Sequence, residues 1–233
     1  MSSSGALPLY MQISELLIRD IAAGRLTDGH RLPPEREMAA GLGIAVGTLR
    51  QALKALSDKG LVERIQGSGN YIRAKADPTS VYALLRIELL SGGGLPTARV
   101  LSVDRLPKDP ALPAFGRSPE GHRIRRLRFL SGVVAAVEEI WLDAALVDRI
   151  APEDLSESLY LYYRQRLNLW IAQAEDRVGL GPLPGWAPAE FPHTPDTPLP
   201  KITRITKAQD GQSVEASFTW YDPDRVAYVA RLK

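Results

Sequence analysis

The chain has 233 residues, 45% hydrophobic and 24% charged, which is typical of a globular protein and fits one large domain or two ordinary ones. It contains no cysteine, which excludes disulfides and thiolate metal sites, and no apolar run approaches the roughly 20 residues that cross a bilayer. The formal net charge is only +2, but residues 1–75 carry +3, so the basic excess lies where phosphate binding would need it.

Three helices are predicted in the first quarter of the chain. Apolar residues recur at helical spacing after Pro8 and predict a helix that Gly24 ends. Residues 32–42 predict a second, short helix. A third is expected at residues 46–59, with Gly60 at the position where helices commonly end.

The third helix has two distinct faces. Val46, Leu49, Leu53 and Leu56 form an inward stripe. The residues on another face are Gly47, Arg50, Lys54 and Ser57. Two short helices joined by a turn at Gly43 are typical of a helix-turn-helix, whose second helix lies in the major groove. The planar fork of Arg50 suits that position, because it can donate two hydrogen bonds to guanine O6 and N7.

Residues 61–65 and 71–72 predict two strands joined by Gly67-Ser68-Gly69. Such a hairpin is the wing of a winged helix, and its small tip would fit a neighbouring minor groove. The alternative is a small structural domain of three helices and a hairpin, with Arg50 and Lys54 as solvated surface charges.

Five segments in the first 72 residues occur together in a characteristic order: PLYMQI (8–13), GHRLPPERE (29–37), GTLRQAL (47–53), GLVER (60–64) and QGSG (66–69). They resemble the GntR family of bacterial regulators almost without gaps. The resemblance implies a winged helix-turn-helix domain over residues 1–74 that binds double-stranded operator DNA. The DNA contacts that it implies are Arg36, Thr48, Arg50, Gln51, Gln66 and Gly67.

The chain departs from this family at the start of the third helix. The family usually has Ser-Arg-Thr or similar where this chain has Ala45-Val46-Gly47. Without Ser at 45 the helix loses a cap, and without Arg at 46 it loses a base or phosphate contact. We therefore expect DNA binding to persist at an operator that differs from the usual family site.

A linker is predicted at residues 75–80, where the chain is polar and contains Pro78. Residues 81–233 predict an α+β domain with a mainly antiparallel sheet. Its expected elements are strands at 97–105, 122–130, 133–142 and 171–178, a helix at 158–167, and an antiparallel meander at 201–207, 213–221 and 226–232.

Short motifs in this domain are Arg126-Leu127-Arg128, Glu138-Glu139, Ser158-Leu159-Tyr160, Asp210-Gly211-Gln212 and Tyr221-Asp222. They resemble the UTRA effector domain of the HutC branch of the GntR family. The resemblance implies a chorismate-lyase-like fold, a homodimer, and a pocket for a small anionic metabolite. The effector contacts expected are Thr97, Arg126, Arg128, Glu138, Ser158 and Tyr160.

Strand geometry supports an anion site independently of that resemblance. Arg126 and Arg128 are alternate residues on one strand, so both guanidinium groups face the same side and can bind carboxylate or phosphate. Ser158 adds a hydroxyl at a helix start, beside backbone N–H groups. The alternative is that Arg126 and Glu138 form only a cross-strand ion pair, and that Ser158 is only a helix cap.

Seven prolines between Pro182 and Pro200 exclude a regular helix where the family usually has one. This change alters one wall of the expected pocket. Trp186 and Phe191 lie in the same segment. We expect these rings to fix the loop to the core rather than to close over a ligand.

The sequence thus predicts a cytoplasmic, homodimeric repressor whose operator binding is relieved by a small carboxylate, amino-acid-like or sugar-phosphate effector. Two alternatives remain: a dimeric regulator without a ligand, and a lyase-type enzyme that uses the second domain. The three histidines, His30, His122 and His193, are scattered and show no catalytic or metal-binding spacing. We therefore expect no catalytic residue, no metal and no cofactor.

Overall fold

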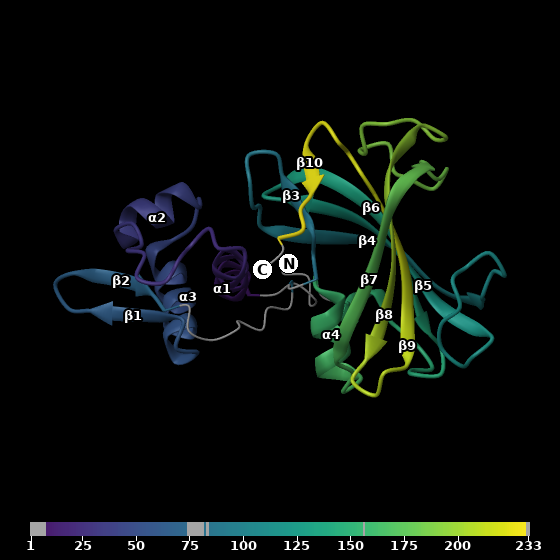
Figure 1. The fold of residues 1–233 in the computed structure, drawn as a ribbon, viewed down its shortest axis with the longest axis horizontal. Coiled ribbons are helices and arrows are strands. Elements are labelled where there is room, and N and C mark those ends of the chain that lie inside the picture. The colour runs from purple at the N-terminus through teal and green to yellow at the C-terminus, as the bar shows by residue number, and fades with distance from the viewer. Residues whose placement is uncertain (1–7, 74–81, 83, 156, 232–233) are drawn as a thin grey trace. The chain divides into compact units, whose positions relative to one another are not determined.

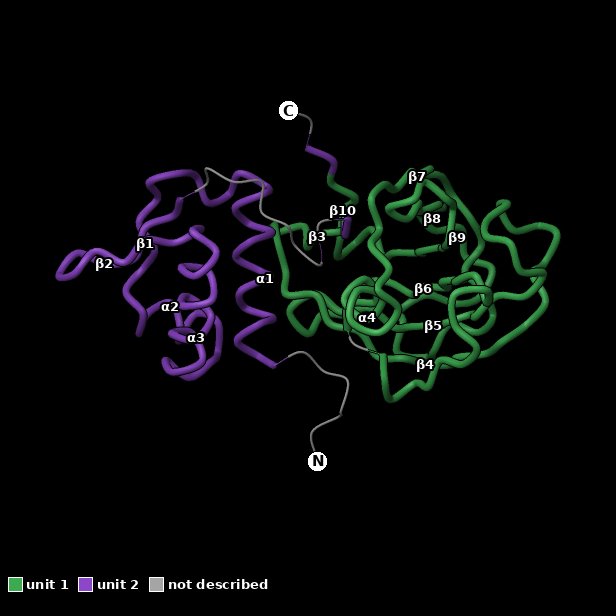
Figure 2. The backbone as a smooth tube through the Cα atoms, turned by 90° about the horizontal axis from the view of Figure 1, so that it is seen from below, with its two compact units in different colours: residues 1–6, 86–229 green, residues 7–85, 230–233 purple. Residues whose placement is uncertain are grey.

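The computed structural model describes residues 8–73, 82, 84–155 and 157–231. The predicted linker at residues 75–80 lies outside them. The chain divides into two compact units, one of residues 7–85 with 230–233 and the other of residues 86–229 with 1–6 (Figure 2). Each unit is described by itself.

The first unit is a three-helix cluster with a two-stranded hairpin (Figure 1). Its elements are α1 (Leu9–Ala22), α2 (Glu35–Gly41), α3 (Val46–Asp58), β1 (Val62–Ile65) and β2 (Gly69–Ile72). They agree with the predicted helices and strands to within a few residues. Among the described residues, no helix is long and apolar enough to span a membrane.

Helix α3 buries the predicted stripe except at its first residue, Val46, which is only partly buried. Leu49 and Leu56 are fully buried and Leu53 is 6% exposed, whereas Arg50 on the other face is exposed. Ala45 precedes the helix in an extended conformation, and no side chain caps the first turn. The loss of the cap that the sequence predicted is therefore confirmed.

Replacing Ala45 by serine is expected to stabilise the first unit by about 1 kcal/mol, because a hydroxyl at this position accepts a hydrogen bond from the first turn of α3. Thermal unfolding should show a midpoint several degrees higher. Ala45→Val, which adds bulk without an acceptor, is the control and should give no gain. An equal gain in both variants would contradict capping as the cause.

The second unit is built on one antiparallel sheet in the order β4-β5-β6-β9-β8-β7. A short turn, η1, and helix α4 connect β6 to β7. The elements are β3 (Ile87–Leu89), β4 (Pro96–Pro107), β5 (Glu120–Leu130), β6 (Val133–Asp143), η1 (Pro152–Asp154), α4 (Leu159–Arg166), β7 (Ile171–Pro182), β8 (Pro198–Ala208), β9 (Ser213–Tyr221) and β10 (Val226–Tyr228).

The prediction that the last strand continues the meander was wrong. Strand β10 pairs with β3, and these two form a separate sheet. The reason is that β9 already has β6 on one side and β8 on the other, so it offers no free edge to the strand that follows. A three-residue strand such as β3 has too little alternation to be recognised in the sequence.

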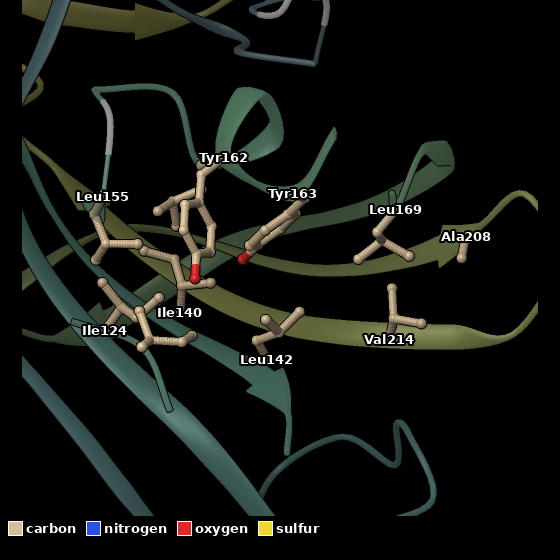
Figure 3. Close-up of a cluster of buried hydrophobic side chains, with 11 residues drawn as sticks. Ile124, Ile140, Leu142, Leu155, Tyr162, Tyr163, Leu169, Ala208 and Val214 are labelled. Carbon is tan, nitrogen blue, oxygen red and sulfur yellow. The ribbon is translucent and has the colours of Figure 1, made fainter. Parts of the chain in front are cut away.

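The two faces of the sheet bury different clusters. On the face covered by α4, Tyr162 and Tyr163 point from the helix toward Ile140 and Leu142 of β6 (Figure 3). The other face packs Leu127 and Trp220 against Phe191 of the proline-rich segment. The chain positions α4 above the central strands, and its first turn therefore lies near the charged residues described below.

The proline-rich segment has no helix between β7 and β8, as predicted. Phe191 is only 2% exposed in the core of the sheet, and Trp186 packs partly against the same cluster. The guanidinium of Arg125 lies 4.8 Å from the centre of the Trp186 ring. These contacts agree with the expectation that the rings of Trp186 and Phe191 fix the proline-rich loop to the sheet.

Candidate nucleic-acid interface and buried charge cluster

A groove of about 840 Å³ runs between α2, the start of α3 and the wing formed by β1 and β2. Four arginines line it: Arg31, Arg36, Arg50 and Arg64. Glu35 and Glu37 are the carboxylates in the lining, so the groove has an excess of positive charge. Such a surface attracts the phosphate backbone of a nucleic acid.

Four of the six predicted DNA contacts line this groove, namely Arg36, Arg50, Gln66 and Gly67. Thr48 and Gln51 lie on α3 outside the lining. Arg50 is the fifth residue of α3, and its side chain is 62% exposed. Its Nε donates to Oε2 of Glu35 at 2.6 Å.

The wing tip depends on glycine. Gly67 has φ of +75°, a left-handed backbone conformation that residues other than glycine rarely adopt. The tip joins Ile65 of β1 to Gly69 of β2, which face each other in the register. A Cβ at Gly69 would lie 3.3 Å from Nε of Arg31, so the wing and the loop before α2 are closely packed.

Sequence reasoning did not single out Arg31, Arg64, Glu35 or Asn70 in this groove. Arg31 and Glu35 fall inside the GHRLPPERE segment and Arg64 inside GLVER, so the motifs contained the signal. Asn70 is 8% exposed on β2, a burial that its polar character does not suggest.

In the second unit, Arg126, Arg128 and Glu138 form a buried ion-pair cluster. They are 5%, 4% and 5% exposed. Arg128 donates to both carboxylate oxygens of Glu138, each at 3.0 Å, and Nη2 of Arg126 lies 2.7 Å from Oε2. The two arginines therefore do converge on one face, and Glu138 holds them there.

This cluster contains two cations and one anion. Burial alone would raise the pKa of Glu138, but the two guanidiniums outweigh it and lower that pKa to about 2. Burial lowers the pKa of Arg126, and the charge of Glu138 opposes this effect. The carboxylates of Glu157 and Glu215 also interact electrostatically with Arg128 and Arg126, respectively, so the two buried guanidiniums face more than one carboxylate.

The start of α4 closes over this cluster. The backbone carbonyl of Glu157 accepts from Nη1 of Arg126 at 3.4 Å and from Nη1 of Arg128 at 3.3 Å. Ser158 follows directly and caps α4, its Oγ accepting from the N–H of Leu161 at 3.4 Å. Nε of Arg126 is buried and, among the described residues, has no hydrogen-bond partner.

Tyr160 lies farther along the same helix, in a second polar cluster. Its hydroxyl donates to Glu215 at 3.3 Å, and Tyr163 donates to the other oxygen of that carboxylate at 2.7 Å. Burial raises the pKa of Glu215, and these hydrogen bonds oppose the rise. Arg204 also hydrogen-bonds Tyr160 and makes a bidentate ion pair with Asp176, at 2.5 and 2.7 Å.

The structure does not bring Thr97 into this group. Thr97 pairs with Phe129 in the sheet, whereas Ala98 and Val100 pair with Arg128 and Arg126. Directly opposed residues share a face, and successive residues alternate between faces. Thr97 therefore lies on the face opposite the two arginines.

Comparison with known proteins gives two family matches. Residues 9–72 match the family described as bacterial regulatory proteins, gntR family, and residues 91–227 match the UTRA domain. The HTH-type transcriptional regulator SmoD of Agrobacterium fabrum is 60% identical over 231 residues, 99% of both chains. The HTH-type transcriptional repressor NagR of Bacillus subtilis is 26% identical over 96% of this chain and 94% of its own.

The fold is also similar to that of a solved structure. The crystal structure of YydK from Bacillus subtilis, described as a possible transcriptional regulator, matches 97% of this chain and 100% of its own, with a TM-score of 0.52 and 21% identity. At this identity the similarity shows the fold alone.

Proposed function

The chain belongs to the GntR family of bacterial regulatory proteins, in the branch with a UTRA domain, and from this premise we propose that it is a repressor whose operator affinity falls when a small anion binds its second domain. The chain is a DNA-binding transcriptional regulator rather than an enzyme. Its predicted fold, a winged helix-turn-helix followed by a sheet-rich UTRA domain, is confirmed.

The arginine-lined groove supports the DNA-binding part of the proposal. In our assignment Arg50 reads a base edge in the major groove, and Arg36 contacts a phosphate at the start of α2. Gly67 and Gln66 bring the wing to the neighbouring groove. Thr48 and Gln51, near the start of α3, complete the proposed DNA contacts.

The buried Arg126–Glu138–Arg128 cluster supports the effector part of the proposal: two guanidiniums share one carboxylate, and Nε of Arg126 has no hydrogen-bond partner among the described residues. A small carboxylate or phosphate would pair with the guanidiniums and accept a hydrogen bond from this N–H. We assign the anion contacts to Arg126, Arg128 and Ser158 and the positioning of the arginines to Glu138, with Tyr160 in the second polar cluster around Glu215. Thr97 is left out because of its place on the other face of the sheet.

The effector class that fits is a small carboxylate, an amino-acid-like compound or a sugar phosphate. We further propose a cytoplasmic homodimer, in which residues 1–74 bind DNA, residues 75–80 link the domains, and residues 81–233 bind the effector and dimerise. Such a dimer would bind a pseudo-palindromic operator. The effector acts by favouring one arrangement of the two DNA-binding domains over another.

A regulator whose second domain only dimerises is the alternative. Solvent exposure of both Arg126 and Arg128 outside a cavity would favour that alternative. Both are buried and share one carboxylate, which favours an anion site instead.

The experiment that tests the proposal is thermal unfolding of the protein against a panel of small carboxylates, amino acids and sugar phosphates. A ligand at 100 times its dissociation constant should stabilise the fold by about 2.7 kcal/mol and raise the midpoint clearly. The same compound should then release the protein from DNA taken from its own upstream region. A panel without any shift would favour the alternative.

Replacing Arg126 by alanine is expected to leave operator binding intact and to abolish the response to the effector, because the variant loses the proposed anion contact. Fluorescence anisotropy of labelled operator, with and without the effector, measures both properties. Arg125→Ala is the matched control: this neighbour lies on the other face, paired with Glu139 at 2.8 Å, and should keep the response. Loss of DNA binding in Arg126→Ala would instead indicate a structural role.

A further inference from the structure

A carboxylate lies among the arginines of the DNA-binding groove. Glu35 is the first residue of α2, and its side chain is 19% exposed. A negative charge in this place repels the phosphates that the groove attracts. It therefore weakens DNA binding unless it supplies a compensating interaction.

The compensating contact is with Arg50. Oε2 of Glu35 accepts from Nε of Arg50 at 2.6 Å. The carboxylate is also fixed from the wing, because the buried side chain of Asn70 hydrogen-bonds it. Asn70 is itself held in place, since its backbone carbonyl accepts from the N–H of Leu32 at 2.9 Å. Glu35 is thus an anchored acceptor beside a long, exposed side chain.

This contact determines which nitrogens of Arg50 remain for DNA. Across the described residues, the guanidinium makes this one hydrogen bond, through Nε. The two terminal Nη groups are left, and they form the fork that matches O6 and N7 of guanine. Ordering a free arginine costs rotamer entropy on binding, and an arginine that is already held loses less.

The charge of Glu35 persists at neutral pH. The hydrogen bond from Arg50 lowers the pKa of this carboxyl, and the hydrogen bond from Asn70 and the charge of Arg64 act in the same direction. Arg50 therefore faces an ionised acceptor, and charge-assisted hydrogen bonds of this kind are stronger than neutral ones.

From this geometry we infer that Glu35 is a positioning residue that holds the Arg50 guanidinium for base reading, and that it thereby sets the sequence specificity of the protein. The inference rests on the proposed role of Arg50 in the major groove. The opposite arrangement is an inhibitory one, in which Glu35 occupies Arg50 and must release it before DNA binds. The two arrangements predict opposite signs for the same substitution.

The test uses Glu35→Ala in the full-length protein. An operator duplex is first selected by the wild-type protein from a randomised pool, and a scrambled duplex of equal length serves as the non-specific probe. At fixed salt, we expect the operator affinity to fall about tenfold, the scale of one charge-assisted hydrogen bond. Affinity for the scrambled duplex should stay equal or rise, because a repelling charge has been removed.

Glu37→Ala is the matched control. Glu37 lies on the same helix, lines the same groove and is exposed, so its removal changes the charge equally without touching Arg50. It should leave the ratio of specific to non-specific affinity unchanged. Glu35→Gln retains a neutral acceptor and should give an intermediate loss. Thermal midpoints measured for all variants identify any that fail to fold, and Glu35→Gln then serves in place of an unfolded Glu35→Ala.

Base-pair substitutions in the operator separate positioning from a structural effect. Glu35→Ala should discriminate less between bases at the same base pair where Arg50→Ala does. In a protein that already carries Arg50→Ala, adding Glu35→Ala should have no further effect on this discrimination. A rise in operator affinity, or a specificity ratio equal to that of the wild type, would overturn the role of Glu35. An unchanged footprint in Arg50→Ala would instead overturn the proposed role of Arg50.

Discussion

Replacing Glu138 by glutamine is expected to destabilise the second unit by about 3–5 kcal/mol, because it leaves two buried guanidiniums without their shared counter-charge. Each arginine is too deeply buried to recover its hydration. Denaturant unfolding of the wild type and the variant, followed by circular dichroism, measures the difference.

A surface ion pair provides the control. Glu120 pairs with Arg105 at 2.8 Å, and both side chains are about two-fifths exposed. Glu120→Gln should cost no more than about 1 kcal/mol, because water screens that pair. Equal costs at the two positions would mean that the Arg126–Glu138–Arg128 cluster is hydrated in solution.

The same substitution should change the dependence of stability on pH. The folded pKa of Glu138 is lowered to about 2, so its ion pairs stabilise the fold above the ordinary glutamate pKa. That stabilisation is lost as the pH falls from about 5 toward 2. The wild type should therefore lose its advantage over Glu138→Gln across this acidic range, and the difference between the two curves removes the contribution of other carboxylates.

The spacing of residues along each helix or strand was sufficient to predict which side chains share a face. The stripe of Leu49, Leu53 and Leu56 was predicted because helical spacing places these side chains on one face. Arg126 and Arg128 were predicted to converge because alternate strand residues share a side. Both results follow from local geometry, which a single sequence contains.

Register and pairing between distant segments were not predicted. Thr97 falls on the other face because a difference of one residue in register reverses the side of the sheet. Strand β10 pairs with β3, which lies well over a hundred residues away. The Glu35–Arg50 contact likewise joins two helices and depends on the angle at which they pack.

The cluster around Glu138 contains both the structural contacts and the candidate anion-binding groups that the sequence suggested. The cross-strand ion pair of Arg126 and Glu138, weighed as an alternative to a ligand site, is present. Ser158 is also a helix cap, as the structural alternative held. Neither contact excludes an anion, because Nε of Arg126 is buried and has no hydrogen-bond partner among the described residues.

Replacing Arg50 by alanine is expected to cost about 1–3 kcal/mol of specific DNA binding, which corresponds to roughly a 5- to 150-fold loss of operator affinity. The reason is that the guanidinium of Arg50 can donate two hydrogen bonds to one base, and alanine at this position donates none. Footprinting and anisotropy at a fixed salt concentration measure the loss, and the preferred base at one position of each half-site should become relaxed.

Arg36→Ala should behave differently and so serves as the comparison. Arg36 lines the same groove from α2, and our assignment gives it a phosphate contact. Its loss should weaken binding to all sequences about equally and reduce the slope of log affinity against log salt by about one. If Arg50→Ala also weakened all duplexes equally, Arg50 would be a phosphate contact, and the operator would be read by other residues of α3 or by the wing.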